Sequence, residues 1–261
     1  PADLTEDDYE VQVESEASQY IPFAIDEVNL DFQVLGPSAT DETSVDVLLA
    51  ASRKEKVDDR VMVAELAGLK PVIIDVEPYA ARISIDSIIS QLPAGGEGLI
   101  LAVFDIGQTA TRLSVVYNGQ TIFEREQPFG GSKLTQEIVR LYGLTVEEAE
   151  LKKRTGDLPE NYTTELLHPF VEEGATELAR SLQFFFSSTP YERVDRIFLA
   201  GGAAVTPGLA EAVLQKTSVT TEILSPFQGM EIGDSISEKQ MNLDAPALLV
   251  SCGLAMRRFD Q

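Results

Sequence analysis

The first third of the chain alternates between apolar and polar residues in short runs. Val28, Leu30, Phe32 and Val34 are separated by polar residues, which is the period-two pattern of a half-buried strand. The other elements expected up to residue 91 are helices over 5–20, 54–69 and 78–91 and strands over 45–52 and 71–77. Two strands, a helix and a further strand predict a compact α+β unit.

The pattern changes after the glycine-rich linker 93–98, which we take as a domain boundary. Residues 99–107 are almost continuously apolar, and 112–126 alternate around Asn118-Gly119, a typical hairpin turn. Three antiparallel strands are therefore expected between 99 and 126. The elements expected beyond them are helices near 132–142, 145–154, 163–187, 208–216 and 245–259 and a buried strand over 196–202.

The net charge of the chain limits the kinds of partner that it can bind. The 261 residues include 20 Lys and Arg against 43 Asp and Glu, a net charge of −23. This balance excludes non-specific nucleic-acid binding and disfavours direct adhesion to an anionic membrane, since both need a basic surface. Residues 1–52 hold thirteen acids and no Lys or Arg. Two interpretations of that block are open: a solvated acidic face, or a surface that binds a basic partner segment.

The sequence lacks the residues that several common kinds of site require. Cys252 is the only cysteine, so an internal disulfide is impossible and a reducing compartment is expected. His168 is the only histidine, which argues against a Ser/His/Asp triad, and no metal-ligand spacing surrounds it. The sequence contains neither a P-loop nor a Rossmann fingerprint, and no signal peptide or membrane-spanning run is expected. Because the chain begins at Pro1 rather than at methionine, we expect a fragment of a longer protein.

The segment 105–111, DIGQTAT, is the first candidate ligand site. A turn with Gly107 at its tip lets backbone N–H groups approach phosphate oxygens, and Thr109 and Thr111 add hydroxyls. Asp105, at the strand end, is suitably placed to hold Mg²⁺ through water molecules. A plain hairpin explains the same residues, so both interpretations are open.

Three further segments combine glycines or an acid with an element boundary. Gly130 and Gly131 precede a helix, which suits a phosphate and equally suits an ordinary helix cap. Gly201 and Gly202 follow a buried strand and permit close approach of backbone to a purine or ribose. Glu77 is expected at the end of the strand 71–77, where a carboxylate could orient a water molecule.

Taken in order, these segments resemble a family. Asp-Ile-Gly in a hairpin, Gly-Gly-x-x-Leu-Thr, Ala-Glu-x-x-Lys and Gly-Gly followed by Pro-Gly-Leu resemble the actin-like ATPases, with FtsA and MreB as the nearest groups. Within them, SQYIPF (18–23) and LDFQVL (30–35) resemble the PilM family of type IV pilus assembly. The resemblance covers essentially the whole chain.

The resemblance implies an α/β, actin-like (ribonuclease-H-like) fold of two lobes with a small inserted α+β subdomain. The implied division is a subdomain over 1–68, a remnant of the first lobe over 69–96 and 246–261, and the second lobe over 97–245. The implied ligands are ATP and Mg²⁺. Matched by position, the implied ligand-binding residues are Asp105, Gly107, Thr109 and Thr111 in the second phosphate hairpin, Gly130 and Gly131, Glu150 and Lys153 at the ribose, and Gly201 and Gly202 at the adenosine; Asp105 would hold the metal through water, and Glu77 would align the attacking water.

Two departures from the family weaken the expectation of catalysis. The first phosphate hairpin, which should precede the inserted subdomain, is absent, so the N-terminal strands of the first lobe are missing. Ala110 stands where a threonine commonly holds the water, and losing one positioned group can raise a barrier by about 2.7–4 kcal/mol. We therefore expect weak nucleotide binding by this chain and little or no hydrolysis.

The resemblance implies a cytoplasmic, nucleotide-binding scaffold rather than an enzyme. Such a scaffold captures the cytoplasmic N-terminal segment of the membrane protein PilN and links the alignment subcomplex, including PilO, to the pilus motor. It would reach the inner membrane only through this partner. The alternatives are an active ATPase, a sugar kinase of the same fold, or a filament-forming cytoskeletal protein, and self-association is compatible with each.

Overall fold

The computed structural model describes residues 4–38, 41 and 43–257. The chain divides into two compact units, residues 1–76 and 77–261. Each is described by itself. Within the described residues, no helix is both long enough and apolar enough to cross a lipid bilayer.

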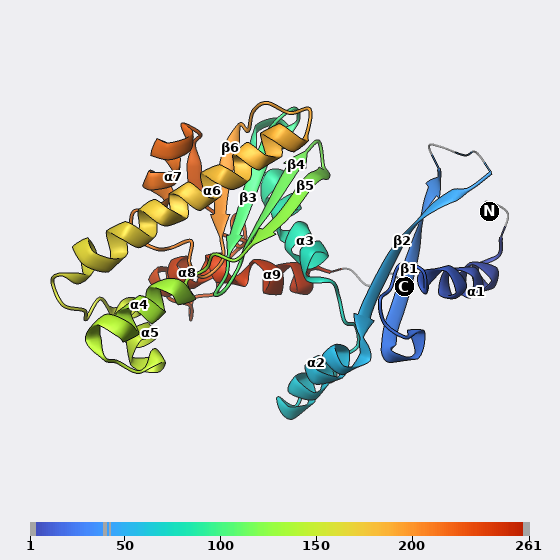
Figure 1. Cartoon of the computed structure of the whole chain (residues 1–261), viewed down its shortest axis with the longest axis horizontal. Helices are drawn as coiled ribbons and strands as arrows, with labels where there is room; N and C mark the ends of the chain where they lie inside the picture. The colour runs from blue at the N-terminus through green and yellow to red at the C-terminus, as the bar shows by residue number, and fades with distance from the viewer. Residues whose placement is uncertain (1–3, 39–40, 42, 258–261) are drawn as a thin grey trace. The chain divides into compact units, whose positions relative to one another are not determined.

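The first unit is a two-stranded ribbon flanked by helices (Figure 1). Its elements are α1 (Glu6–Ala17), a 3-10 turn (Ile25–Glu27), β1 (Val28–Pro37), β2 (Val45–Arg53) and α2 (Lys54–Leu66). β1 and β2 pair antiparallel, with Val28 opposite Arg53. α1 starts at a capping box, in which Thr5 and Asp8 each accept a backbone hydrogen bond from the other. The predicted strands and helices of residues 5–69 are confirmed.

The ribbon leaves one face of α1 incompletely covered. A cavity of 610 Å³ lies between α1 and β2, and Val13 and Ala17 line it on the helix while Val47 and Leu49 line it on the strand. A pair of strands alone is too narrow to bury a helix fully. The expected third strand of this unit would have widened the sheet.

The prediction of a third strand over 71–77 is wrong. Residues 70–76 belong to no strand, and Glu77 is the first residue of a helix. Val72 is 79% exposed and Ile74 47% exposed. An apolar run becomes a strand only when a neighbour takes its backbone hydrogen bonds, and no described strand pairs with this segment.

The second unit contains a five-stranded sheet in the order β5-β4-β3-β6-β7. The strands are β3 (Ile100–Ile106), β4 (Thr111–Tyr117), β5 (Gln120–Gln127), β6 (Arg196–Ala200) and β7 (Thr221–Ile223). β3, β4 and β5 are antiparallel neighbours, whereas β6 runs parallel to β3 and β7 parallel to β6. The predicted hairpin at Asn118-Gly119 is confirmed, and both residues have positive φ.

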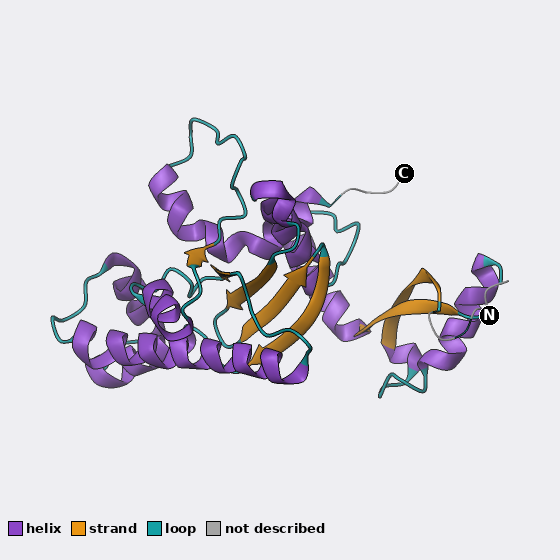
Figure 2. Cartoon of the chain, turned by 90° about the horizontal axis from the view of Figure 1, so that it is seen from above, coloured by secondary structure: helices purple, strands orange, loops and turns teal. Residues whose placement is uncertain are grey.

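Alternation along β3 sends side chains into two cores. Phe104 and Ile106 pack with Leu178 and Phe185 of α6 (His168–Ser188), which lies across one face of the sheet (Figures 1 and 2). On the other face, Leu101 and Val103 pack against helices near both ends of this unit. These two helices are α3 (Glu77–Ile89) and α9 (Leu249–Met256).

The remaining helices follow the predicted pattern with small shifts at their ends. They are the 3-10 turn Pro93–Gly96, α4 (Ser132–Tyr142), α5 (Val146–Thr155), a π turn (Thr163–Leu167) leading into α6, α7 (Leu209–Thr217), α8 (Glu238–Asp244) and the 3-10 turn Ala245–Leu248. The closing helix expected over 245–259 begins later, at Leu249, and its last two expected residues lie outside the described residues. β7 and α8 were not predicted.

Candidate functional site

The β3–β4 hairpin is built around Gly107. Its N–H donates to the carbonyl oxygen of Ala110 at 2.9 Å, which closes the turn. The Thr111 hydroxyl is buried and donates to the carbonyl of Phe129 at 2.7 Å. This hydroxyl therefore faces the protein interior, contrary to its expected ligand contact, while Thr109 at the tip is exposed.

Gly130 and Gly131 pack directly onto this hairpin. The N–H of Gly131 donates to the carbonyl of Gly107 at 3.0 Å, and that of Ser132 donates to Gln108 at 2.8 Å. A Cβ atom on Gly130 would lie 2.4 Å from the Gln108 carbonyl oxygen. Both N–H groups at the start of α4 are thus satisfied by the hairpin rather than left free for a phosphate, because the carbonyls are the nearest acceptors. The glycines join hairpin to helix.

Gly201 brings the loop after β6 against the end of β3. Its φ is +87°, and a Cβ atom there would lie 2.4 Å from the carbonyl oxygen of Ile106 and 2.5 Å from Oδ1 of Asp105. The next residue, Gly202, is exposed. The N–H of Ala203 donates to the Ile106 carbonyl at 3.1 Å. Only glycine fits this approach, so Gly201 places the loop beside the Asp105 carboxylate.

The Asp105 carboxyl group is partly buried and lies among other charged side chains. Burial raises the pKa of its carboxyl group, the nearby charge of Glu77 raises it further, and Arg112 opposes both by lowering it. Among the described residues, none donates a hydrogen bond to this carboxylate. A half-buried acid with free oxygen atoms is suited to hold a hydrated cation beside a phosphate.

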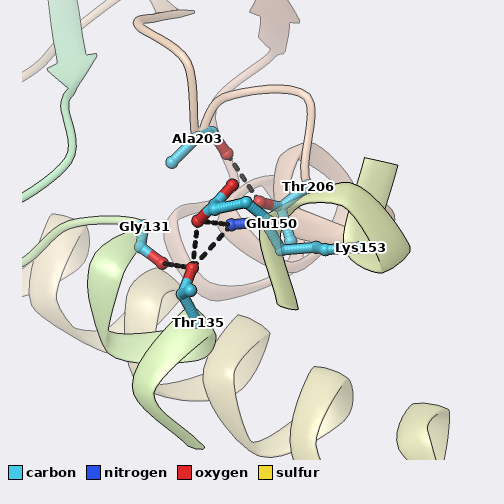
Figure 3. A network of polar contacts seen from close by, with 6 residues as sticks. All are labelled: Gly131, Thr135, Glu150, Lys153, Ala203 and Thr206. Carbon is cyan, nitrogen blue, oxygen red and sulfur yellow. Dashed lines mark hydrogen bonds and ion pairs between the residues drawn. The ribbon is translucent and has the colours of Figure 1, made fainter. Parts of the chain in front are cut away.

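Glu150 and Lys153 of α5 form a polar network with α4 (Figure 3). Lys153 Nζ lies 2.8 Å from Thr135 Oγ1 and 2.7 Å from Glu150 Oε1, and Thr135 also bonds Glu150 and the Gly131 carbonyl. Partial burial raises the pKa of Glu150, but hydrogen bonds from Lys153 and Thr135 and nearby positive charge outweigh it and hold the pKa below its usual value. The carboxylate is therefore held in place and ionised.

The structure connects most of the expected site residues. Figure 3 shows Ala203 and Thr206, from the loop after β6, beside the α4–α5 network, and a Cβ atom on Gly131 would lie 3.2 Å from that of Ala203. Three segments distant in sequence thus meet at the end of the sheet where the central strands β3 and β6 finish. The residues linked there by direct contacts or close approach are Asp105, Gly107, Gly130, Gly131, Glu150, Lys153 and Gly201.

Sequence reasoning missed two members of this site. Thr135 ends the segment GGSKLT and is the hydroxyl that joins α4 to α5, so its place in that segment was a usable signal. Arg112 forms ion pairs with Glu77 at 3.9 Å and with Glu126 at 3.0 Å. Nothing in the sequence pairs Arg112 with Glu77, since a helix and a strand bring them together. Within the described residues, no group of three or more metal-ligating side chains is present.

Replacing Asp105 with asparagine is expected to stabilise the chain at neutral pH. The folded-state pKa of Asp105 lies above 3.8, so ionisation at higher pH opposes folding, and this penalty disappears only when the pH falls toward 3.8. We expect a gain in the free energy of unfolding greater than about 0.5 kcal/mol, the range of ordinary surface substitutions. Denaturant unfolding at several pH values between 4 and 7.5 measures it.

Asp157→Asn is the control of opposite sign. A hydrogen bond from Lys152 lowers the pKa of Asp157, and the charge of Lys152 adds to this, so its ionised form favours folding above 3.8. This variant should be destabilised at neutral pH, with the loss nearly constant down to about pH 4 and shrinking only as the pH falls below 3.8. If Asp105→Asn were destabilised in the same way, the Asp105 carboxylate would be favourably paired in the fold.

Comparison with known proteins identifies the family. Residues 1–259 match the family described as "Type IV pilus assembly protein PilM". A solved structure described as a PilM-PilN type IV pilus biogenesis complex is 29% identical, covers 98% of this chain and 74% of the other, and superposes with a TM-score of 0.77.

More distant structures share the fold alone. The ethanolamine utilization protein EutJ of Carboxydothermus hydrogenoformans is 19% identical, with 78% of this chain and 62% of that chain covered and a TM-score of 0.55. MreB 5 of Spiroplasma citri, solved with AMPPNP, is 16% identical over 78% of this chain and 64% of that chain, with a TM-score of 0.50. The fold is actin-like, as the order of motifs predicted. The chain belongs to the PilM family of type IV pilus assembly proteins.

Proposed function

We propose that this chain is an assembly scaffold of the type IV pilus that binds the cytoplasmic N-terminal segment of PilN. The observation that carries the proposal is the 98% of this chain that superposes on the PilM-PilN complex. The acidic block at 1–52 supports it, because thirteen acids without a Lys or Arg suit a basic segment. Through PilN the scaffold would lie at the cytoplasmic face of the inner membrane and link PilO to the pilus motor.

The second part of the proposal is that ATP with Mg²⁺ binds at the end of the sheet where β3 and β6 finish. Gly107 would shape the turn, the exposed Thr109 at its tip would face the phosphates, and Asp105 would hold Mg²⁺ through water. Glu150 and Lys153 would contact the ribose, and Gly201 and Gly202 would border the adenosine. When bound, Mg²⁺ supplies neutralisation of the phosphate charge. The close contacts among these segments support a single site.

We propose that the bound nucleotide is held rather than turned over. Ala110 brings no hydroxyl to the hairpin, and the Glu77 carboxylate is ion-paired with Arg112 at 3.9 Å instead of standing free. A group that aligns water must accept its hydrogen bond, which an ion pair discourages.

A titration of the whole chain with the labelled PilN N-terminal peptide tests the scaffold. Fluorescence anisotropy should rise with a dissociation constant below about 100 μM, or −5.5 kcal/mol, and a scrambled peptide of the same charge should bind more weakly. If the two peptides bind equally, charge alone attracts them. Absence of binding at this concentration to folded protein would refute the scaffold.

Phosphate release with Mg-ATP separates the scaffold from the alternative functions. We expect release at background rate, unchanged in Glu77→Ala. Robust turnover that Glu77→Ala abolishes would establish an ATPase, and turnover that depends on an added sugar would establish a kinase. Sedimentation with and without nucleotide detects filaments.

A further inference from the structure

A row of charged side chains crosses three neighbouring strands beside the phosphate hairpin. Asp105 on β3 lies directly opposite Arg112 on β4, and Arg112 lies directly opposite Glu126 on β5. Residues paired in this way project from the same face of a sheet. The order of charges across the sheet is therefore acid, base, acid.

A third carboxylate reaches the same guanidinium from outside the sheet. Glu77, at the first turn of α3, lies 3.9 Å from Arg112 Nη1, and Glu126 lies 3.0 Å from Nη2. Asp105 and Glu126 flank Arg112 on the neighbouring strands, so Glu77 is the third carboxylate placed around one guanidinium. The Arg112 side chain is 28% exposed, whereas the side chains of Glu77 and Glu126 are 65% and 59% exposed, so solvent screens both ion pairs in part.

We propose that Arg112 is a positioning residue that serves as the resident cation of this carboxylate cluster. Its planar guanidinium spreads one positive charge over several N–H donors, which lets a single side chain serve acids on different elements. It ties the start of α3 to β4 and β5 and neutralises the acids around Asp105. The hairpin is consequently stable without a divalent cation of its own.

The inference has a consequence for how Mg²⁺ reaches the hairpin. With Arg112 between Glu77 and Glu126, Asp105 is the one carboxylate of the cluster without an ion pair. Mg²⁺ is usually held in proteins by one or two carboxylates together with substrate phosphates. Under the proposed function, Mg²⁺ would therefore arrive with the nucleotide. The state of the empty hairpin is tested separately below, so failure of nucleotide binding leaves the test intact.

Counting bound Mn²⁺ by electron paramagnetic resonance tests the inference on the whole chain. Wild type and Asp105→Asn should bind the same number of Mn²⁺ ions in 0.15 M NaCl, since the cluster holds no metal. Arg112→Met should gain one site, bound at least about tenfold more tightly than the general surface, because Glu77 and Glu126 then lose their cation and their side chains can turn toward a divalent ion. Adding Glu77→Gln to Arg112→Met should remove that site.

Thermal unfolding supplies an independent readout. Arg112→Met should lower the melting temperature by about 2–4 °C, and millimolar Mg²⁺ or Mn²⁺ should restore it, whereas NaCl of equal ionic strength should not. Arg82→Met is the matched control, because Arg82 is also half-buried but is paired with one acid, Asp86. Its loss of stability should not respond to divalent cations.

Two results would overturn the inference. One is a divalent site in wild type that Asp105→Asn removes, a test that needs no change at Arg112. The other is a folded Arg112→Met protein that neither gains a Mn²⁺ site nor recovers with divalent cations. If Arg112→Met fails to fold, Arg112→Lys replaces it: a resident-cation role predicts wild-type Mn²⁺ counts for lysine, with some loss of stability because an ammonium group cannot bridge acids on different elements as the guanidinium does. A gained Mn²⁺ site in Arg112→Lys would overturn the inference.

Discussion

Replacing Gly253 with alanine is expected to lower the free energy of unfolding of the second unit by at least about 3 kcal/mol. A Cβ atom at this position would lie 1.7 Å from the carbonyl oxygen of Ala80, where α9 crosses α3. The obstacle is backbone, which cannot rotate away, so the two helices must separate. The separation would also break the hydrogen bond from the Ser84 hydroxyl to the Leu249 carbonyl, 2.7 Å long.

Helix propensity and steric overlap predict effects of opposite sign for this substitution. Alanine is favoured over glycine in a helix by about 1 kcal/mol, so helix propensity alone predicts that Gly253→Ala stabilises the chain. Thermal unfolding should instead show a fall of about 6–12 °C in the melting temperature. An unchanged or higher melting temperature would mean that α3 and α9 do not cross this closely.

Gly174→Ala and Gly233→Ala are matched controls. Gly174 also lies within a helix, but its Cβ atom would meet the ends of the Phe129 and Leu209 side chains at 3.0 and 3.1 Å, which can shift. Gly233 has open space around it. We expect the loss of stability to decrease in the order Gly253, Gly174, Gly233.

The second large effect is expected at the site itself, from Gly201→Ala. The substitution combines strain at φ +87° with the close approach of a Cβ atom to the Ile106 carbonyl oxygen, 2.4 Å away. Strain alone costs about 1 kcal/mol and overpacking adds about 1–3 kcal/mol. The added atom also presses on the Asp105 carboxylate, so any Mg-nucleotide binding measured for wild type should be lost. Denaturant unfolding and calorimetry with Mg-ATP measure the two effects.

Gly143→Ala and Gly156→Ala separate strain from contact. Both glycines end helices with φ of +66° and +75°, and a Cβ atom on either would have no other atom within 4 Å, so each variant experiences the strain alone. Gly201→Ala should lose at least about 1 kcal/mol more than either control. If all three variants lose the same stability, the loop after β6 does not lie against the end of β3.

The elements of the second unit were predictable because local patterns match their final environments. The continuous apolar run of β3 is buried on both faces, and the Asn118-Gly119 turn adopts the positive φ that its residues favour. The order of the glycine segments also indicated the actin-like fold. Short-range chemistry was sufficient for these parts.

Other features depended on partners that the local sequence does not specify. Residues 71–76 are as apolar as a strand, yet they form none without a paired neighbour. The Thr111 hydroxyl is a sensible phosphate ligand by pattern, but the chain folds Phe129 over it and takes its hydrogen bond. In both cases a long-range hydrogen-bond partner decided the outcome.

The sequence by itself determined the family, the actin-like fold and the order of the glycine segments along the chain, since motif order and hydrophobic period are properties of the chain alone. Only the tertiary structure decided which of those segments meet. It closed the start of α4 with hairpin carbonyls, joined Glu150 to Thr135, and placed Arg112 between Glu77 and Glu126. Such contacts join residues far apart in sequence, and sheet register and helix crossing set their distances.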